Sequence, residues 1–296
     1  MRNKLDGTIV GMLKKNSKKN KGFYLFLLLL ICGISLPALS GLLVFPFSIV
    51  PTELTLEYTI VLSFVFLLSA LFLRSNESLE GYWQVFFAFF IASLAIFIDF
   101  LVNLSSDTMN GITLDTLISA SIIVSTIILL TRISGNSLSS IFLKKGNLKL
   151  GLVIGLTGFF IFALFSIPAA EYLFQGQNLN IDKVIAWMPW ILPIVLMNGV
   201  REELMYRGLF LKKFEVKLGL KSSNFLQAVI FSLSHSVAGV GLNVYTPFIW
   251  VLVIFTFSLG LAWGFIMQRT NSALGSILFH AGTDIPVFIG IFSNTF

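Results

Sequence analysis

Long apolar runs separated by short polar stretches divide this 296-residue chain. Each run is near the ~20 helical residues that are needed to cross a bilayer. We expect spans at about 22–45, 56–73, 82–104, 113–131, 150–174, 184–210, 224–240, 247–268 and 272–293. The second run is short, and the seventh is compatible with a partly re-entrant segment. The pattern therefore predicts an all-α fold, a polytopic transmembrane helix bundle of about eight to nine spans.

The composition supports a membrane protein and argues against nucleic acid as a partner. Apolar residues make up 56% of the chain and charged residues 11%, which is typical of an integral membrane protein. The net charge of +6 does not indicate nucleic acid, because the basic residues lie in the N-terminal tail and in short loops. Such loops suit contact with anionic lipid head groups. The single cysteine, Cys32, allows no intramolecular disulfide.

The basic residues also predict an orientation. Residues 1–21 contain seven Lys or Arg against one acidic residue, Asp6, directly before the first apolar run. By the positive-inside rule, the N-terminus is expected in the cytoplasm of a multi-pass protein of the cell membrane. Two other predicted inner loops are basic as well, with Arg132, Lys144, Lys145 and Lys149 in one and Lys212, Lys213, Lys217 and Lys221 in the other. The first run is long enough to be a retained span rather than a cleaved leader.

The most unusual stretch is 201–208, which places two carboxylates and two guanidinium groups at the end of the sixth apolar run. An ionisable group in a membrane costs from about 2.5 to more than 10 kcal/mol, so such a cluster predicts a functional site. In a helix Glu203 and Arg207 lie on one face and can pair, whereas Glu202 points about 100° away from Glu203. Glu202 is therefore the carboxylate that is free to do chemistry.

The chain offers few polar partners for Glu202. Its two histidines, His235 and His280, lie in separate apolar runs, and Asp284 shares a helix face with His280. At 1.5 Å per residue, Glu202 is ~15 Å from the cytoplasmic end of its helix, and His235 is ~16 Å from the start of its own. His280 and Asp284 lie ~12 and ~18 Å into the last helix, which also starts inside. The shared depth predicts that three helices bring these groups to one interior site.

Other polar and helix-breaking residues have simpler explanations. Asp99 and Glu171 fall near predicted outer ends of spans, where water is within reach. Pro189 and Pro193 are expected to kink the sixth span just before the glutamates and to help open a water-filled pocket there.

Three short motifs coincide with these groups. They are EExxxR at Glu202, Glu203 and Arg207, FxxxH from Phe231 to His235, and a final histidine with an acid four residues on, at His280 and Asp284. In order and within apolar runs, they resemble the CPBP intramembrane protease family, also called Abi. Its members include CAAX prenyl endopeptidases and bacterial bacteriocin-processing or self-immunity proteins. The resemblance covers roughly 184–293, and it divides the chain into a basic tail at 1–21, N-terminal transmembrane helices at 22–149 and a CPBP/Abi-like protease domain at 150–296.

The resemblance implies an intramembrane endopeptidase that acts on a membrane-associated, hydrophobic or lipidated peptide without a metal or cofactor. It implies that Glu202 is the general base and that His235 positions the water. Glu203 with Arg207 would orient the site, and His280 with Asp284 would form the oxyanion site. These roles agree with the chemistry, because hydrolysis needs a base and donors for the developing oxyanion. A carboxylate donates only when it is protonated, so Asp284 fits its role less well than the Asn of other members.

Two other classes of function remain open. Two histidines and one acid also suit a catalytic Zn²⁺ site, which predicts a zinc-dependent intramembrane protease, although no HExxH helix is present. A non-catalytic membrane protein, such as an immunity factor, a scaffold or a transporter, also buries charges at mid-depth. The sequence predicts no substrate-binding residues and indicates no oligomeric state.

Overall fold

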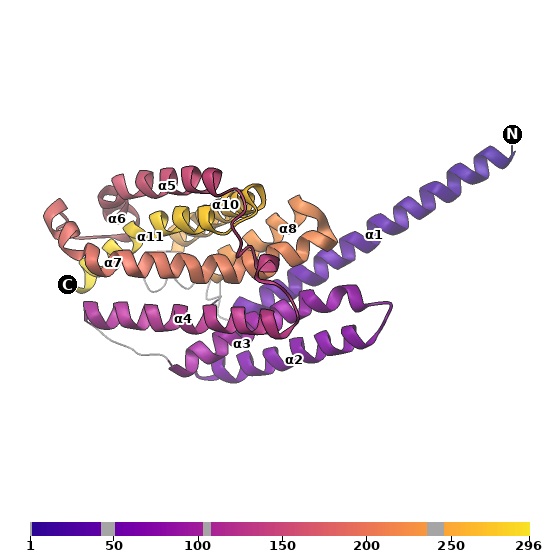
Figure 1. Ribbon diagram of the computed structural model, residues 1–296, viewed down its shortest axis with the longest axis horizontal. Helices are drawn as coiled ribbons and strands as arrows, with labels where there is room; N and C mark the ends of the chain where they lie inside the picture. Colours follow the sequence, from indigo (N-terminus) through magenta and orange to yellow (C-terminus); the bar gives the residue numbers. More distant parts are fainter. Residues whose placement is uncertain (1, 43–50, 103–107, 236–245) are drawn as a thin grey trace.

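The computed structural model describes residues 2–42, 51–102, 108–235 and 246–296 (Figure 1). Within these ranges the chain forms helices and no strand, which confirms the all-α class. The helices are α1 (Arg2–Leu39), α2 (Thr55–Ser75), α3 (Trp83–Val102), α4 (Met109–Ile133), α5 (Leu148–Leu164), α6 (Ser166–Phe174), α7 (Ile181–Glu202), α8 (Lys212–Ser234), α10 (Thr246–Thr270) and α11 (Leu274–Thr295). A π-helix, η4 (Glu203–Leu211), joins α7 to α8, and short 3₁₀ turns lie at Thr52–Leu54, Glu80–Tyr82 and Leu138–Ile141.

The described residues contain seven helical stretches that are long and apolar enough to cross a membrane. Helices α5 and α6 make an eighth candidate if the pair, bent by 66°, is one broken span. One of the seven, Ile181–Ser234, is 54 residues long and contains the expected span at 184–210 and the first part of the one at 224–240. At 1.5 Å per residue its path along the chain is ~80 Å, more than one crossing of the ~30 Å core of a bilayer requires. The protein is therefore a multi-pass membrane protein.

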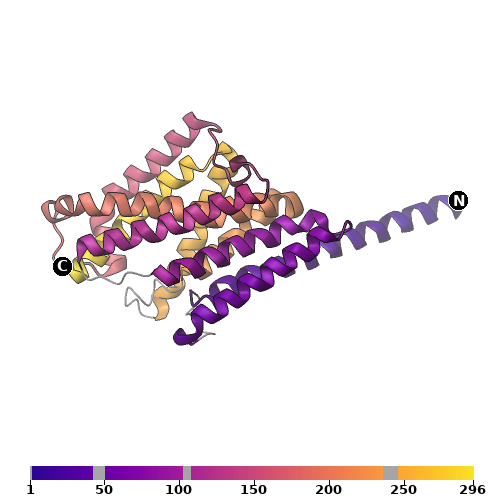
Figure 2. The same ribbon diagram turned by 60° about the horizontal axis from the view of Figure 1, so that its bottom comes forward.

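Two expected non-helical regions are helical in the structure. Residues 2–21 of the basic tail are continuous with the first span in α1, whose N-terminal half extends beyond the bundle (Figures 1 and 2). Lysine has good helix propensity, so a basic segment next to a span can continue its helix. The loop expected at 211–223 is also helical, except at Gly219, where φ is 76°. Only glycine adopts this left-handed region readily, and the chain changes direction there.

Helix α7 connects the two halves of the bundle. It packs against α11 on one side and α4 on the other, while α2, α3 and α4 follow one another in contact (Figure 1). Helix α11 also packs against α5 and α6, and α10 packs against α8 and α11. The π-helix contacts α3 through Phe210, whose ring centroid is 4.9 Å from that of Phe89. The end of α7 thus lies in the interior, between the N-terminal and C-terminal helices.

Helices α7 and α11 approach closely at Gly199. A methyl group at this position would come within 3.0 Å of the carbonyl oxygen of Ile277, a contact that requires a neighbour to move. Gly199 lies one turn before Glu203, and Ile277 lies one turn before His280. The small residue therefore lets the backbones approach and brings the glutamates of α7 and η4 beside the histidine of α11.

Candidate active site

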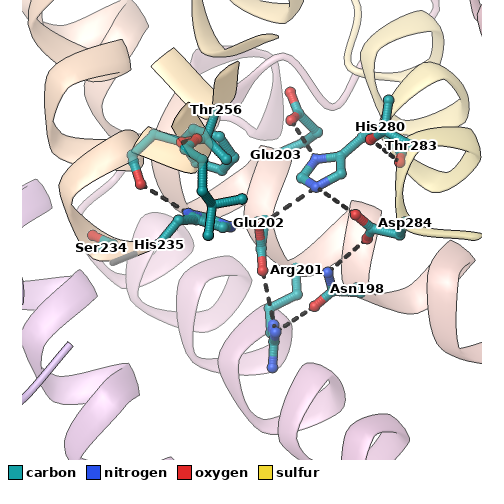
Figure 3. Close-up of polar contacts among 12 residues, drawn as sticks. Asn198, Arg201, Glu202, Glu203, Ser234, His235, Thr256, His280, Thr283 and Asp284 are labelled. Atoms are coloured by element: carbon teal, nitrogen blue, oxygen red, sulfur yellow. Dashed lines mark hydrogen bonds and ion pairs between the residues drawn. The ribbon is translucent and has the colours of Figure 1, made fainter. Parts of the chain in front are cut away.

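The two adjacent glutamates lie at the junction of two kinds of helix. Glu202 is the last residue of α7, and Glu203 is the first residue of the π-helix η4, all of whose residues are buried. A π-helix is wider than an α-helix and is found frequently at functional sites. No motif in the sequence predicts it. Glu202 turns toward His235 and His280, and Glu203 turns toward the other side of His280 (Figure 3). Glu203 also contacts Arg207.

The predicted ion pair between Glu203 and Arg207 is present. Arg207 Nη1 lies 2.8 Å from Glu203 Oε1, and neither side chain is exposed. The Arg207 guanidinium also lies over the ring of Phe231, 4.1 Å from its centroid, and 5.1 Å from that of Trp263. Charge pairing and the two aromatic faces together accommodate a cation that would otherwise be costly to bury.

His280 lies between the two glutamates. Its Nδ1 is 2.8 Å from Glu203 Oε1, and its ring stacks on that of Trp263 with 4.0 Å between centroids. An ionised carboxylate only accepts hydrogen bonds, so Nδ1 carries the proton of this contact. The other nitrogen, Nε2, faces Glu202 Oε2 at 3.5 Å. The contact with Glu203, which sequence spacing does not predict, fixes both the ring orientation and the tautomer of His280.

His235 approaches Glu202 from a second helix. It is the C-cap residue of α8, which ends at Ser234. Residues 236–240 of the span expected at 224–240 lie outside the described residues. Its Nδ1 is 2.8 Å from the carbonyl oxygen of Phe231, which can only accept, so Nδ1 donates. Its Nε2 then faces Glu202 Oε2 at 3.1 Å. The four-residue interval of the FxxxH motif thus orients the histidine through the backbone of its phenylalanine.

Glu202 is where these groups converge. Its Oε2 faces Nε2 of both His235 and His280, and Oε1 is 3.3 Å from Nη2 of Arg201. In neutral histidines that donate through Nδ1, each Nε2 is an acceptor, as is Glu202 Oε2. Accordingly, no described residue donates a hydrogen bond of good geometry to this buried oxygen. Two of these acceptors, Glu202 Oε2 and His235 Nε2, suit the two protons of one water molecule.

Asp284 joins the site through α11, but it is held as an acceptor. Its Oδ1 lies 3.6 Å from His280 Nε2, and its Oδ2 accepts a 2.8 Å hydrogen bond from Asn198 Nδ2. Asn198 Oδ1 in turn accepts from Arg201 (Figure 3). Sequence reasoning includes Arg201 in the ionisable cluster at 201–208 but assigns it no role, and it misses Asn198. One signal was available: Asn198 is a polar residue in an apolar run, one helical turn before Glu202.

A cavity of about 210 Å³ lies beside Glu202 and His235. Arg201, Tyr206 and Ser234 also line it, and its opposite wall includes Ile96, Asp99 and Phe100 of α3 and Ile123 of α4. Asp99 was expected near an outer end of its span, in contact with water. The structure places Asp99 near the C-terminal end of α3 and partly exposed, and it also places it on the cavity wall that faces the candidate active site, which local spacing cannot predict.

The described residues contain no group of three or more His, Cys, Asp or Glu side chains in an arrangement that could hold a metal ion. Helix α7 contains Pro189 and Pro193 and is continuous through both.

Comparison with known proteins found one family that matches the segment containing the candidate site. Residues 184–286 match the family described as "Type II CAAX prenyl endopeptidase Rce1-like". The match supports the assignment of this segment to the CPBP family. No curated protein and no solved structure matched the chain. The CPBP segment contains Glu202, Glu203, Arg207, His235, His280 and Asp284, whereas the wall of the cavity formed by α3 and α4 lies outside it.

Proposed function

We propose that this protein is an intramembrane endopeptidase that hydrolyses a peptide bond with water activated by Glu202 and His235. One observation carries the proposal: Glu202 Oε2 lies 3.1 Å from Nε2 of His235 and 3.5 Å from Nε2 of His280. Placing a carboxylate between two imidazoles in a membrane interior costs free energy. Such a group therefore indicates a functional site. The CPBP match supports a membrane protease of the CAAX type.

In this mechanism Glu202 is the general base and His235 orients the water. The water donates one proton toward Glu202 Oε2 and the other toward His235 Nε2, while its oxygen attacks the carbonyl carbon of the scissile bond. Glu202 takes a proton from the attacking water and delivers it to the leaving nitrogen as the carbon–nitrogen bond breaks. The products are a new carboxylate and a new amine, so the reaction consumes one water and needs no other reactant.

His280 is the proposed donor to the oxyanion that forms on the carbonyl oxygen. Its Nδ1 already donates to Glu203, so it donates from Nε2 only as an imidazolium with both nitrogens protonated. Asp284 accepts a hydrogen bond from Asn198 and faces the same Nε2, so we assign it to hold His280 rather than to donate to the oxyanion. Glu203 and Arg207 hold the other side of the ring.

The proposed substrate is a hydrophobic or lipidated peptide that lies in or on the membrane. The cavity beside Glu202 has apolar walls from Leu42, Ile96, Phe100 and Ile123, which suit an apolar segment next to the scissile bond. We also propose that the N-terminus is cytoplasmic, because the basic residues of α1 and of the segment after η4 favour that side, where they can contact anionic lipids.

Comparative peptidomics of membranes tests the activity and identifies the substrate together. Cells carrying the intact protein are compared with cells carrying Glu202→Ala, and Glu171→Ala is the matched control because Glu171 is exposed on α6. We expect at least one membrane-associated peptide to be cleaved with the intact and control proteins but not with Glu202→Ala. Identical peptide profiles in all three would contradict the proposal.

A further inference from the structure

We propose that Arg201 and Asn198 are positioning residues for the reaction, and that Ser119 on α4 holds Arg201 in place. The N-terminal helices thereby become part of the catalytic apparatus rather than only a scaffold. This inference rests on the proposed hydrolysis. It assigns a function to residues that belong to none of the three motifs and, for Ser119, that lie outside the CPBP segment.

Arg201 has three partners on two helices. Its Nη1 donates to Ser119 Oγ at 3.0 Å, and its Nη2 donates to Asn198 Oδ1 and lies 3.3 Å from Glu202 Oε1. Guanidinium donors form a rigid planar fork, so fixing Nη1 on α4 also fixes the direction of Nη2. Because Nη2 holds one oxygen of Glu202, the other oxygen, Oε2, points at the two histidines.

Asn198 connects Arg201 to Asp284 on the opposite side of the site. Arg201 has no acceptor, so the amide oxygen of Asn198 faces it and the amide nitrogen faces away. That nitrogen donates to Asp284 Oδ2 at 2.8 Å, and Asp284 Oδ1 lies 3.6 Å from His280 Nε2. Figure 3 shows this continuous chain from Arg201 through Asn198 and Asp284 to His280. One guanidinium therefore orients both the proposed base and the support of the proposed oxyanion donor.

The residue that holds Arg201, and with it this series of hydrogen bonds, lies in the first half of the protein. Ser119 is on α4, which packs against α7, and its hydroxyl also interacts with the carboxylate of Asp99 on α3. Asp99 and Arg201 both line the cavity. A serine hydroxyl can accept from Arg201 and donate to Asp99 at the same time. The structure thus explains why the site includes helices that lie outside residues 184–286.

Turnover measurements separate this role from simple packing. Removing a hydrogen bond to a charged group with Ser119→Ala is expected to lower kcat roughly tenfold, and Asn198→Ala roughly 10- to 100-fold. KM should stay within about threefold, because neither side chain binds the substrate in this scheme. Ser119→Thr keeps the hydroxyl and should recover most of the lost activity. Arg201→Lys should not, because a lysine lacks the planar fork that reaches three partners.

A matched control removes a different hydrogen bond between the same two helices. Trp190 Nε1 on α7 donates to Asn110 Oδ1 on α4 at 2.7 Å, away from the candidate site. Asn110→Ala should therefore leave kcat unchanged. If Ser119→Ala and Asn198→Ala keep kcat within twofold of the intact protein, the positioning role is wrong. An equal loss of kcat in Asn110→Ala would also overturn it, since general loosening of α4 from α7 would then be the cause.

A second readout does not depend on turnover. The chain has two histidines, both at the site, so ¹⁵N-histidine labelling gives ring signals from His235 and His280 alone. We expect Asn198→Ala to shift the His280 signals and Asn110→Ala to leave both rings unchanged. If the intact protein cleaves no peptide but the shift occurs, the proposed function fails and the positioning stands. If it cleaves normally while the variants change neither spectrum nor kcat, the function stands and the positioning fails.

Discussion

His280 Nδ1 lies 2.8 Å from Glu203 Oε1, so the second of two adjacent glutamates holds a histidine in place. Glu203 also pairs with Arg207 and accepts a hydrogen bond from Ser276, and none of its surface is exposed. Such a carboxylate has no free direction from which to take a proton. Glu202, one residue earlier, faces both imidazoles and lines the cavity. Adjacent residues of the same type thus contact different groups, because successive side chains of a helix point about 100° apart.

The first prediction concerns stability. Arg207→Ala leaves the carboxylate of Glu203 buried without its cation, which costs about 3 to 5 kcal/mol in such pairs. We expect this variant to melt at a clearly lower temperature or to yield little folded protein. Glu202→Gln keeps the size and hydrogen-bonding capacity of the side chain, so its melting temperature should stay near that of the intact protein. Thermal unfolding in detergent measures both, and equal stability of the two variants would contradict this division of roles.

The second prediction concerns the oxyanion. His280→Ala should lower the rate of the chemical step by roughly 10² to 10³, the scale for losing one oxyanion donor. Single-turnover measurements with saturating substrate separate this step from binding. The ring of His280 also stacks on Trp263, so His280→Phe, which keeps a ring, is the matched control for packing. Recovery of the rate in His280→Phe would show that packing rather than hydrogen bonding is responsible.

The third prediction concerns orientation in the membrane. In a Cys32→Ser background, cysteines introduced as Lys15→Cys and Lys217→Cys should resist an impermeant thiol reagent in intact cells. Gln177→Cys, in the exposed segment between α6 and α7 that we place outside, should react readily. All three should react after the membrane is permeabilised. Ready labelling of Lys15→Cys or Lys217→Cys in intact cells would reverse the orientation.

The fourth prediction separates the glutamate mechanism from a zinc mechanism. Activity of the purified protein should survive EDTA and phenanthroline, because no step of the proposed reaction uses a metal. Readdition of Zn²⁺ to the chelated sample should leave the rate unchanged. Inhibition by the chelators that Zn²⁺ reverses would favour the metalloprotease with His235 and His280 as ligands.

The sequence predicts the parts of this site that depend on local spacing. The i, i+4 interval predicts the Glu203–Arg207 pair, and rise along a helix predicts that Glu202, His235 and His280 reach one depth, which their contacts confirm. It misses contacts that depend on tertiary packing. The bond from Glu203 to His280 requires the close approach of α7 and α11 at Gly199, which no local pattern specifies.

The remaining differences have the same origin. Asp99 is near the end of its span in the sequence, and only the packing of α3 and α4 beside α7 places it on the cavity wall. The π-helix after Glu202 has no sequence signal among the motifs. Spacing therefore predicts which groups meet at the candidate site, whereas the three-dimensional packing reveals the residues that hold them.

Cleavage by the Glu202→Gln variant tests the central claim most directly. The purified intact protein, Glu202→Gln and the exposed-site control Glu171→Gln are reconstituted in liposomes with a substrate peptide identified by peptidomics, and product formation and peptide binding are both measured. Glutamine keeps the shape of the side chain but cannot take a proton from water. We predict that Glu202→Gln binds the peptide and forms no product, while Glu171→Gln cleaves it like the intact protein. Undiminished cleavage by Glu202→Gln would contradict the assignment of Glu202 as the base.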